Sequence, residues 1–347
     1  MGNALKAGIV GYGYMGQIRK TVIEEHPNLE LSAICDANLL LADSDFGCPI
    51  FTDYRDILEK DVDIVFVCTP NAFSPEIVIS SLNQGKHVFC EKPPGRSIDD
   101  IRDIIEAEKA NTPAKLMFGF NHRYHPCVNE AKVLVDSGRY GKILSLRGVY
   151  GKSGGLGFED SWRNKKEISG GGILLDQGIH MMDLFRLFCG DFQEVKGFVT
   201  NSYWNIDMED NAFAMLRNEQ GQVATLHSSA TLWKHTFRLE VFMEQGYFVI
   251  SGLLSKTGSY GRETLVVGKR QFEDETFALG NPREEVTYFD RDLSWITEVS
   301  DFVDCIQNDK CVTNSSSTDA LKVMELIGRI YGDDPKYKVE RFGGGGE

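Results

Sequence analysis

The sequence predicts an α/β protein with two domains, the first built on a parallel sheet and the second on a mainly antiparallel one. Over the first 120 residues, short apolar runs alternate with longer segments of helical periodicity. One of these runs, residues 63–68, is apolar on both faces, which is typical of a strand covered by helices on each side. After about residue 140, runs rich in β-branched and aromatic residues are separated by turn residues.

Helices between short buried strands form βαβ units, so we expect a doubly wound parallel sheet in the first part of the chain. Gly85 is a stop signal for one helix, and Ser97, followed by acids at 99 and 100, is a start signal for the next. The expected strands are 7–10, 29–35, 63–68, 87–90 and 115–118, and the expected helices are 15–25, 73–84 and 98–110.

The second part is expected to be an α+β domain, because tight turns between neighbouring strands favour antiparallel pairing. We assign residues 1–120 to the first domain and 121–347 to the second, with 343–347 as a flexible glycine-rich tail. The expected strands are 142–150, 194–201, 212–217, 222–230, 236–244 and 246–251, and the expected helices are 172–188, 293–307 and 317–330.

Composition and charge exclude several classes of protein. With 42% hydrophobic and 25% charged residues the chain is neither disordered nor collagen-like. The net charge of −14 disfavours nucleic acid and anionic membranes as partners, although a local basic pocket for one anionic ligand remains open. We expect a cytoplasmic protein, because no secretory or spanning segment is recognisable and the eight cysteines contain no C-x-x-C pair.

A polar segment, residues 121–127, contains two histidines and a cysteine. His122, His125 and Cys127 could be imagined as metal ligands, but no second group of ligands lies at suitable spacing in the sequence. We therefore expect an ordinary polar loop and no metal.

A glycine-rich loop, Gly11-x-Gly13-x-x-Gly16, follows the first predicted strand and opens the first predicted helix. This context is typical of dinucleotide binding: Gly11 permits the turn, Gly13 lets the backbone approach a pyrophosphate, and Gly16 lets the helix pack on the strand. The alternative is a tight turn without a ligand.

An acid, Asp36, ends the next strand at the spacing that the dinucleotide motif requires. A carboxylate there accepts hydrogen bonds from the ribose hydroxyls and repels a 2′-phosphate, so NAD is favoured over NADP. If Asp36 only caps a loop, the preference stays open.

Two further strand ends carry candidate residues, at the edge of the sheet where such folds bind ligands. Lys92, in Glu91-Lys92-Pro93, can polarise a substrate hydroxyl, or it is a surface lysine. The run Thr69-Pro70-Asn71 suits a turn at the same edge, with turn chemistry as the alternative.

A polar stripe interrupts an apolar helical segment after three glycines. Asp176, His180 and Asp183 are spaced at i, i+4 and i+7, so they share one face of the expected helix. A histidine one turn from a carboxylate is a candidate acid or base, although a lone core histidine is more often structural. Asp183 is expected to be structural.

Taken together, these motifs resemble those of the glucose-fructose oxidoreductase, inositol dehydrogenase and rhizopine catabolism (Gfo/Idh/MocA) family, over roughly residues 5–335. The resemblance also includes Asn121-His-Arg123-Tyr124, Trp162-Arg163 and the run from Gly171 to His180. It implies an N-terminal Rossmann domain and a C-terminal α+β domain whose open-faced sheet often forms homodimers or homotetramers.

The resemblance also implies roles for individual residues. Lys92, Asp176 and His180 would be the catalytic group. The cofactor contacts would be Gly11, Gly13, Tyr14, Met15, Gly16, Asp36, Thr69, Pro70, Asn71, Glu91 and Lys92. Asn121, Arg123, Tyr124, Trp162 and Arg163 are candidate substrate contacts, because Trp stacks on sugar faces and Arg clamps anionic groups; surface packing is the alternative for the last four.

The expected function is hydride transfer between NAD(H) and a secondary hydroxyl or ketone of a sugar, cyclitol or nucleotide-linked sugar. One alternative on the same fold is NAD-dependent glycoside hydrolysis, in which the cofactor is restored within each turnover. Another is a non-catalytic regulator that senses a dinucleotide or a sugar. Lys92, Asp176 and His180 together argue against a regulator, since a sensor has no use for a group that transfers protons.

Overall fold

The computed structural model describes residues 4–38, 46–273, 277–278 and 280–335, and it contains two compact units. The first unit includes the chain up to Asn121, the segment Glu167–Gly170 and the segment Trp295–Lys322. The second unit includes His122–Lys166, Gly171–Ser294 and the chain from Val323 onward. The predicted tail, residues 343–347, lies outside the described residues.

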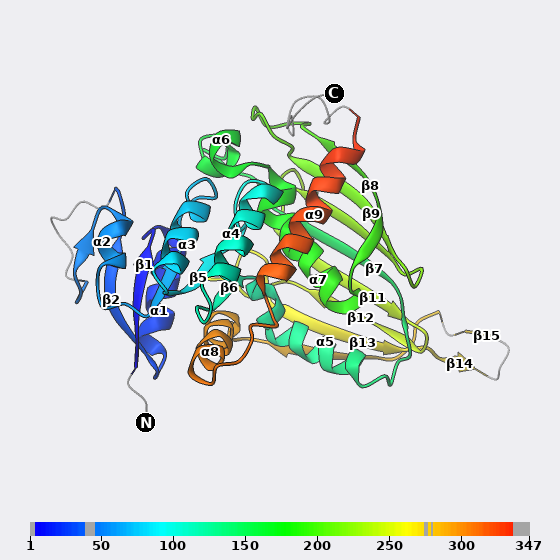
Figure 1. Cartoon of the computed structure of the whole chain (residues 1–347). Helices are drawn as coiled ribbons and strands as arrows, with labels where there is room; N and C mark the ends of the chain where they lie inside the picture. Colours follow the sequence, from blue (N-terminus) through cyan, green and yellow to red (C-terminus); the bar gives the residue numbers. More distant parts are fainter. Residues whose placement is uncertain (1–3, 39–45, 274–276, 279, 336–347) are drawn as a thin grey trace. The chain divides into compact units, whose positions relative to one another are not determined.

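The first unit is built on a parallel sheet of six strands in the order β3-β2-β1-β4-β5-β6. Strands β1, β2, β5 and β6 of this sheet are labelled in Figure 1. The chain leaves β1 toward one edge and returns to β4 on the other side, which places a topological switch point between these two strands. The strands are β1 (Leu5–Val10), β2 (Leu29–Cys35), β3 (Ile50–Phe51), β4 (Ile64–Val67), β5 (His87–Glu91) and β6 (Leu116–Gly119). The predicted parallel sheet is confirmed, and β3 was too short to be predicted.

Helices cover this sheet in the doubly wound manner. The predicted start of α4 is confirmed, because Ser97 and Asp100 form a reciprocal capping box. The helices of this unit are α1 (Tyr14–Glu25), α2 (Tyr54–Leu58), α3 (Ser74–Asn83), α4 (Ile98–Ala110) and most of α8 (Ser294–Gln307).

Helix α8 returns to the first unit from late in the chain. Its residues Val299, Phe302 and Val303 are buried in one cluster with Ile9 and Phe66 of the parallel sheet. The expected division of the chain at residue 120 does not include this return, because sequence order cannot show which core an amphipathic helix joins. That division stays a prediction.

The second unit is built on a sheet of eight strands in the order β16-β13-β12-β11-β7-β10-β9-β8. Only β7 and β10 pair in parallel, so the predicted mainly antiparallel sheet is confirmed. The strands are β7 (Ile143–Gly151), β8 (Phe192–Thr200), β9 (Asn211–Asn218), β10 (Val223–Ser229), β11 (Thr236–Met243), β12 (Gly246–Ser251), β13 (Glu263–Lys269) and β16 (Glu284–Phe289). A separate small sheet pairs β14 (Phe272–Glu273) with β15 (Phe277–Ala278).

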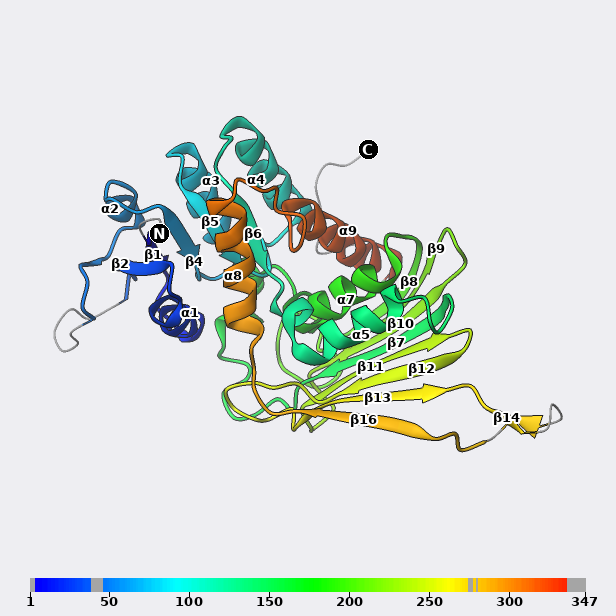
Figure 2. The same ribbon diagram turned by 90° about the horizontal axis from the view of Figure 1, so that it is seen from below.

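One face of the large sheet is covered by α5 (Pro126–Asp136), α7 (Ile179–Cys189) and α9 (Ser317–Asp333), as Figure 2 shows. On the other face the side chains alternate outward, and Phe198, Phe213 and Met215 are exposed there. The second unit is therefore a half-covered sheet.

Two local predictions for this unit are wrong. Residues 121–127 are not a polar loop, because Asn121–Tyr124 forms a 3₁₀ helix (η1) and α5 begins directly afterwards. The expected single helix 172–188 starts instead with a π-helical turn, η3 (Leu174–Gly178), before α7. Two short elements, the 3₁₀ helix η2 (Trp162–Asn164) and helix α6 (Lys166–Ser169), precede that turn.

Candidate functional site

The glycine loop between β1 and α1 has the geometry that its sequence predicts. Gly11 has a φ of +93°, and a Cβ there would lie 2.7 Å from the carbonyl carbon of Cys68. A Cβ on Gly16 would lie 2.2 Å from the Gly11 oxygen, so the close packing of helix and strand requires glycine. Around Gly13 no heavy atom of the described chain lies within 4 Å of a Cβ position. The loop therefore has room at Gly13 and is crowded at the other two glycines.

Asp36, directly after β2, is bound to this loop. One of its carboxylate oxygens accepts a hydrogen bond from the Tyr12 amide at 2.7 Å, and the other accepts from the Asn38 amide at 2.8 Å. The side chain thus fixes the loop conformation and also places a negative charge beside it. The expected loop-capping role and the expected position beside the cofactor are compatible.

The turn after β4 is held by its own polar residues. Thr69 and Ser74 are linked through their hydroxyls at 3.1 Å. The Asn71 amide donates to the Ser169 carbonyl oxygen at 2.7 Å, which ties the turn to the segment Glu167–Gly170 of the same unit. Asn71 therefore anchors the chain just before the glycines that precede Asp176.

A buried ion-pair network fixes the end of β5. The Arg19 guanidinium donates to Glu91 at 2.7 Å and to Glu298 of α8 at 2.8 Å, and it stacks over Phe89. All three charged side chains are buried. The Glu91 carboxylate is thus an internal partner of Arg19, and it fixes the backbone from which the half-buried Lys92 projects.

Asp176 lies in the π-helical turn of the second unit and faces two cations. Its carboxylate forms an ion pair with Lys152, which follows β7, and lies 3.6 Å from the Nε of Arg163. The Arg163 guanidinium stacks over the ring of Trp162, 4.5 Å from its centroid. Trp162 and Arg163 are both half-buried. The structure therefore places Arg163 beside Asp176, and Trp162 against Arg163.

A fully buried carboxylate, Glu209, holds the start of this turn. It accepts hydrogen bonds from the amides of Gly172 and Leu174 at 3.0 and 3.1 Å, and from the hydroxyl of Tyr331 at 2.6 Å. Burial raises the pKa of Glu209, although these three hydrogen bonds oppose that shift. Glu209 therefore caps the segment that carries Asp176.

His180 is the second residue of α7, which follows the π-helical turn directly, and it is buried. Its ring stacks on that of His122, with centroids 3.6 Å apart and planes 16° from parallel. His122 also shares a hydrogen bond of 3.0 Å with the Tyr150 hydroxyl. Burial raises the pKa of Tyr150 well above its usual value, and neighbouring Tyr260 and Asp176 add to the shift. Tyr150 therefore stays a neutral phenol and His180 has a rigid neighbour.

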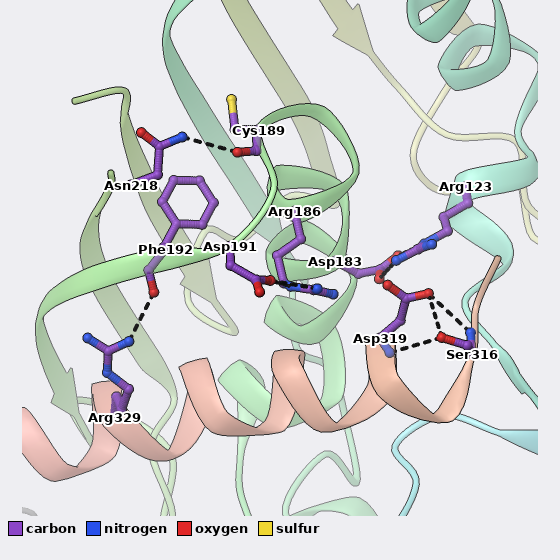
Figure 3. Close-up of polar contacts among 10 residues, drawn as sticks. All are labelled: Arg123, Asp183, Arg186, Cys189, Asp191, Phe192, Asn218, Ser316, Asp319 and Arg329. Carbon is purple, nitrogen blue, oxygen red and sulfur yellow. Dashed lines mark hydrogen bonds and ion pairs between the residues drawn. The ribbon is translucent and has the colours of Figure 1, made fainter. Parts of the chain in front are cut away.

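Arg123 forms a buried bidentate ion pair with Asp183 of α7, at 2.7 and 2.6 Å (Figure 3). The predicted structural role of Asp183 agrees with this pairing. The guanidinium of Arg123 is already held by a carboxylate, so this geometry favours positioning of α7 over binding of a substrate anion. Asn121 and Tyr124, the other predicted substrate contacts of this segment, are buried.

Sequence reasoning missed several residues around Asp176 and His180. Lys152 lies two residues after the predicted strand 142–150 and directly after the observed β7, and this position at a strand end was a usable signal. Glu209 and Tyr150 belong to stretches without a recognisable motif, and His122 was considered only as a metal ligand.

Among the residues that the structure describes, no group of three His, Cys, Asp or Glu could hold a metal ion. Within the same residues, no helix is long and apolar enough to cross a membrane.

The glycine loop, the acid after β2 and the acid-histidine pair define the class of a dinucleotide-binding oxidoreductase. Family models match both halves of the chain: "Oxidoreductase family, NAD-binding Rossmann fold" over residues 5–120 and "GFO/IDH/MocA C-terminal domain" over residues 128–249. Together they cover more than half of the chain, and the chain belongs to the Gfo/Idh/MocA oxidoreductase family, with an NAD-binding first domain.

Curated relatives of the chain include several sugar and cyclitol dehydrogenases. Levoglucosan dehydrogenase of Pseudarthrobacter phenanthrenivorans is 31% identical over 56% of this chain and 54% of its own length. D-glucoside 3-dehydrogenase of Escherichia coli is 27% identical over 74% of this chain and 76% of its own. Inositol 2-dehydrogenase of Salmonella typhimurium is 32% identical over 42% of this chain and 45% of its own. The chain thus matches about half the length of the first and third of these relatives.

The fold is shared with solved structures. A levoglucosan dehydrogenase in complex with NADH and levoglucosan superposes with a TM-score of 0.85 at 24% identity, covering 96% of this chain and 98% of the other. An aldose-aldose oxidoreductase from Caulobacter crescentus superposes with a TM-score of 0.81 at 22% identity, covering 96% and 98%. At these identities the likeness shows the fold.

Proposed function

We propose that the protein catalyses hydride transfer between NAD(H) and a secondary hydroxyl or ketone of a sugar or cyclitol. The observation that carries this proposal is the placement of two groups on consecutive elements: the half-buried Asp176 faces two cations from the π-helical turn, and the buried His180 follows in the first turn of α7. The names of the relatives support the substrate class, because they act on levoglucosan, D-glucosides and inositol.

The residues of the first unit fit the cofactor. The open space at Gly13 suits a pyrophosphate, and the first turn of α1 directs its amides toward that position. Asp36 would hold the adenosine ribose, and the turns after β4 and β5 would contact the nicotinamide half through residues 69–71 and Lys92, whereas the Glu91 carboxylate is held by Arg19. When bound, NAD supplies the hydride acceptor, and these protein residues bind and orient it.

We assign the proton transfer to His180. As a neutral imidazole it would accept the proton of the substrate hydroxyl, and the stacked ring of His122 would keep it in place. Lys92 would donate to the same oxygen and stabilise its developing negative charge. Asp176 would orient the substrate or His180, and Trp162 and Arg163 beside it would contact the substrate.

The proposal is tested by following NADH absorbance while the purified protein is supplied with NAD⁺ or NADP⁺ and a panel of cyclitols, aldoses, uronates and nucleotide-linked sugars. Net NADH formation on at least one free polyol or sugar is expected. Cleavage of a glycoside without net NADH would identify the glycoside hydrolase alternative. Binding of NADH without turnover of any compound in the panel would identify the regulator alternative.

We expect Asp36→Ser to raise the ratio of kcat/KM with NADP⁺ to that with NAD⁺ by about tenfold, because it removes a charge that repels the 2′-phosphate. The kcat/KM values for NADP⁺ and for NAD⁺ are measured with the same sugar substrate. Asp53→Ser, which removes the acid that caps α2 in the same unit, is the matched control and should leave the ratio unchanged. A wild-type protein that turns over faster with NADP⁺ than with NAD⁺ would contradict the role of Asp36.

We also propose that the protein forms a homodimer or homotetramer through the uncovered face of the large sheet. Cross-strand neighbours on that face include Phe198 and Phe213, and Met215 and Tyr288 are exposed on it as well.

All eight cysteines are free thiols, which supports a reducing, cytoplasmic location.

A charge in this face should break the assembly. Met215→Lys is expected to convert the oligomer to a monomer by placing an ammonium group in a desolvated contact. Light scattering gives the molar mass, and Val133→Lys, at an exposed position on α5, is the control. A wild-type protein that is already monomeric at micromolar concentration would contradict the proposal.

A further inference from the structure

Four aromatic residues gather in the second unit on loops that leave one end of the large sheet. Phe158 follows β7, Tyr203 and Trp204 follow β8, and Trp233 follows β10; together they are called the aromatic platform. Tyr203 and Trp233 are 64% and 57% exposed, which is uncommon for such large rings. An exposed cluster of this kind marks a binding surface.

The platform is built rigidly. The Trp204 indole N–H donates to the Ala230 carbonyl oxygen at 3.0 Å, and its ring packs on Phe158 with centroids 4.6 Å apart. Tyr203 meets Trp233 edge-on at 4.7 Å. Trp233 has a φ of +54°, a backbone conformation that a bulky residue rarely adopts, so its ring is presented at a conformational cost.

The platform is continuous with the surroundings of Asp176. Lys152, the ion-pair partner of Asp176, is two residues before Gly154, which lies so close to the Trp204 ring that a Cβ would be 2.1 Å from it. Ser153, between them, shares a hydrogen bond of 3.1 Å with His235 of the loop that carries Trp233. One short stretch of chain thus joins the platform to the candidate catalytic carboxylate.

Charged side chains next to the aromatic platform are suited to hydrogen-bond with the hydroxyls of a sugar. Glu159 is exposed beside Phe158 and accepts a hydrogen bond from the amide of Asn205 at 2.8 Å, and Lys234 is exposed beside Trp233. Pyranose rings present an apolar C–H face and a rim of hydroxyls, so aromatic rings flanked by a carboxylate and an ammonium group match them on both counts. The acidic side chain of Glu159 and the net charge of −14 disfavour an anionic membrane as the occupant.

We infer that the aromatic platform is a second sugar subsite, which takes the pyranose ring linked to the sugar that is oxidised next to Asp176 and His180. The substrate class is then a disaccharide or longer glycoside of the reacting sugar. This inference rests on the proposed function. It extends that function by naming the second sugar that is linked to the reacting ring.

The test compares binding of glucose disaccharides (cellobiose, maltose and trehalose) with binding of the methyl glucosides to the NADH-loaded full-length His180→Ala protein. Calorimetry on this variant measures affinity without turnover. At least one disaccharide is expected to bind about tenfold more tightly than its methyl glucoside, and adding Trp233→Ala should abolish that difference. Val133→Ala, which truncates an exposed apolar side chain on α5, should preserve it.

Several outcomes would overturn the inference. Equal affinity for methyl glucosides and disaccharides, or no binding of either, would remove the subsite; the proposed function itself would fail only if no compound in the NADH panel were turned over. Tighter binding of phenyl β-D-glucoside than of every disaccharide would show that the rings take an aromatic group. A smaller molar mass of Trp233→Ala in light scattering would assign the platform to a contact between copies of the chain. Tyr203→Phe retains the ring and is expected to retain the disaccharide preference.

Discussion

The variant His180→Ala is expected to turn over its sugar substrate with a kcat about 10²–10⁴-fold lower than that of the wild type. In the mechanism proposed above, the buried imidazole accepts the substrate proton, so its loss would leave the hydroxyl without a base. Affinity for NADH should persist, because the dinucleotide residues lie in the first unit and His180 lies in the second. Steady-state kinetics and NADH fluorescence titration measure the two quantities.

Two further variants separate proton transfer from positioning. His122→Ala removes the ring that stacks on His180 and is expected to lower kcat by about tenfold, whereas His122→Phe keeps a stacked ring and should restore most of the rate. His26→Ala removes a buried imidazole at the end of α1 and is the matched control for loss of a histidine. Unchanged turnover in His180→Ala would contradict the assignment of the base.

The variant Asp183→Ala is expected to lose about 3–5 kcal/mol of unfolding free energy, because it leaves the Arg123 guanidinium buried without its bidentate partner. Both side chains are almost fully buried, and they join η1 to α7, the helix whose first turn contains His180 (Figure 3). Chemical denaturation followed by circular dichroism measures the loss, and the activity of the remaining folded protein should fall as well.

A second ion pair, at the C-terminal end of α7, offers a control for this prediction. Arg186 and Asp191 also form an ion pair, but the Asp191 side chain is 47% exposed (Figure 3). Solvent screens such a pair, so Asp191→Ala should cost only about 0–1 kcal/mol. Equal losses in Asp183→Ala and Asp191→Ala would show that burial of the Arg123 pair adds nothing to stability.

Local chemistry made a large part of the first unit predictable. The five longer strands, the helices between them and the capping box of α4 follow from apolar periodicity and from residues a few positions apart. The glycine loop is partly of the same kind: Gly16 is crowded by the nearby Gly11 oxygen, whereas Gly11 is crowded by Cys68, directly after the spatially neighbouring strand β4. Periodicity did not reveal the π-helical turn, because the tight fit of Gly172 against Glu209 involves a residue far along the chain.

The sequence by itself determined the two kinds of sheet, the dinucleotide motif and the family to which the chain belongs, because these depend on periodicity and short spacings. Only the tertiary structure decided that Arg123 binds Asp183, that Lys152 and Arg163 face Asp176, and that His122 stacks on His180. Partners of this kind lie on separate elements, and which of them meet depends on how the whole sheet and its helices pack. A sequence pattern therefore predicts candidate reacting groups, while packing selects the residues that hold them.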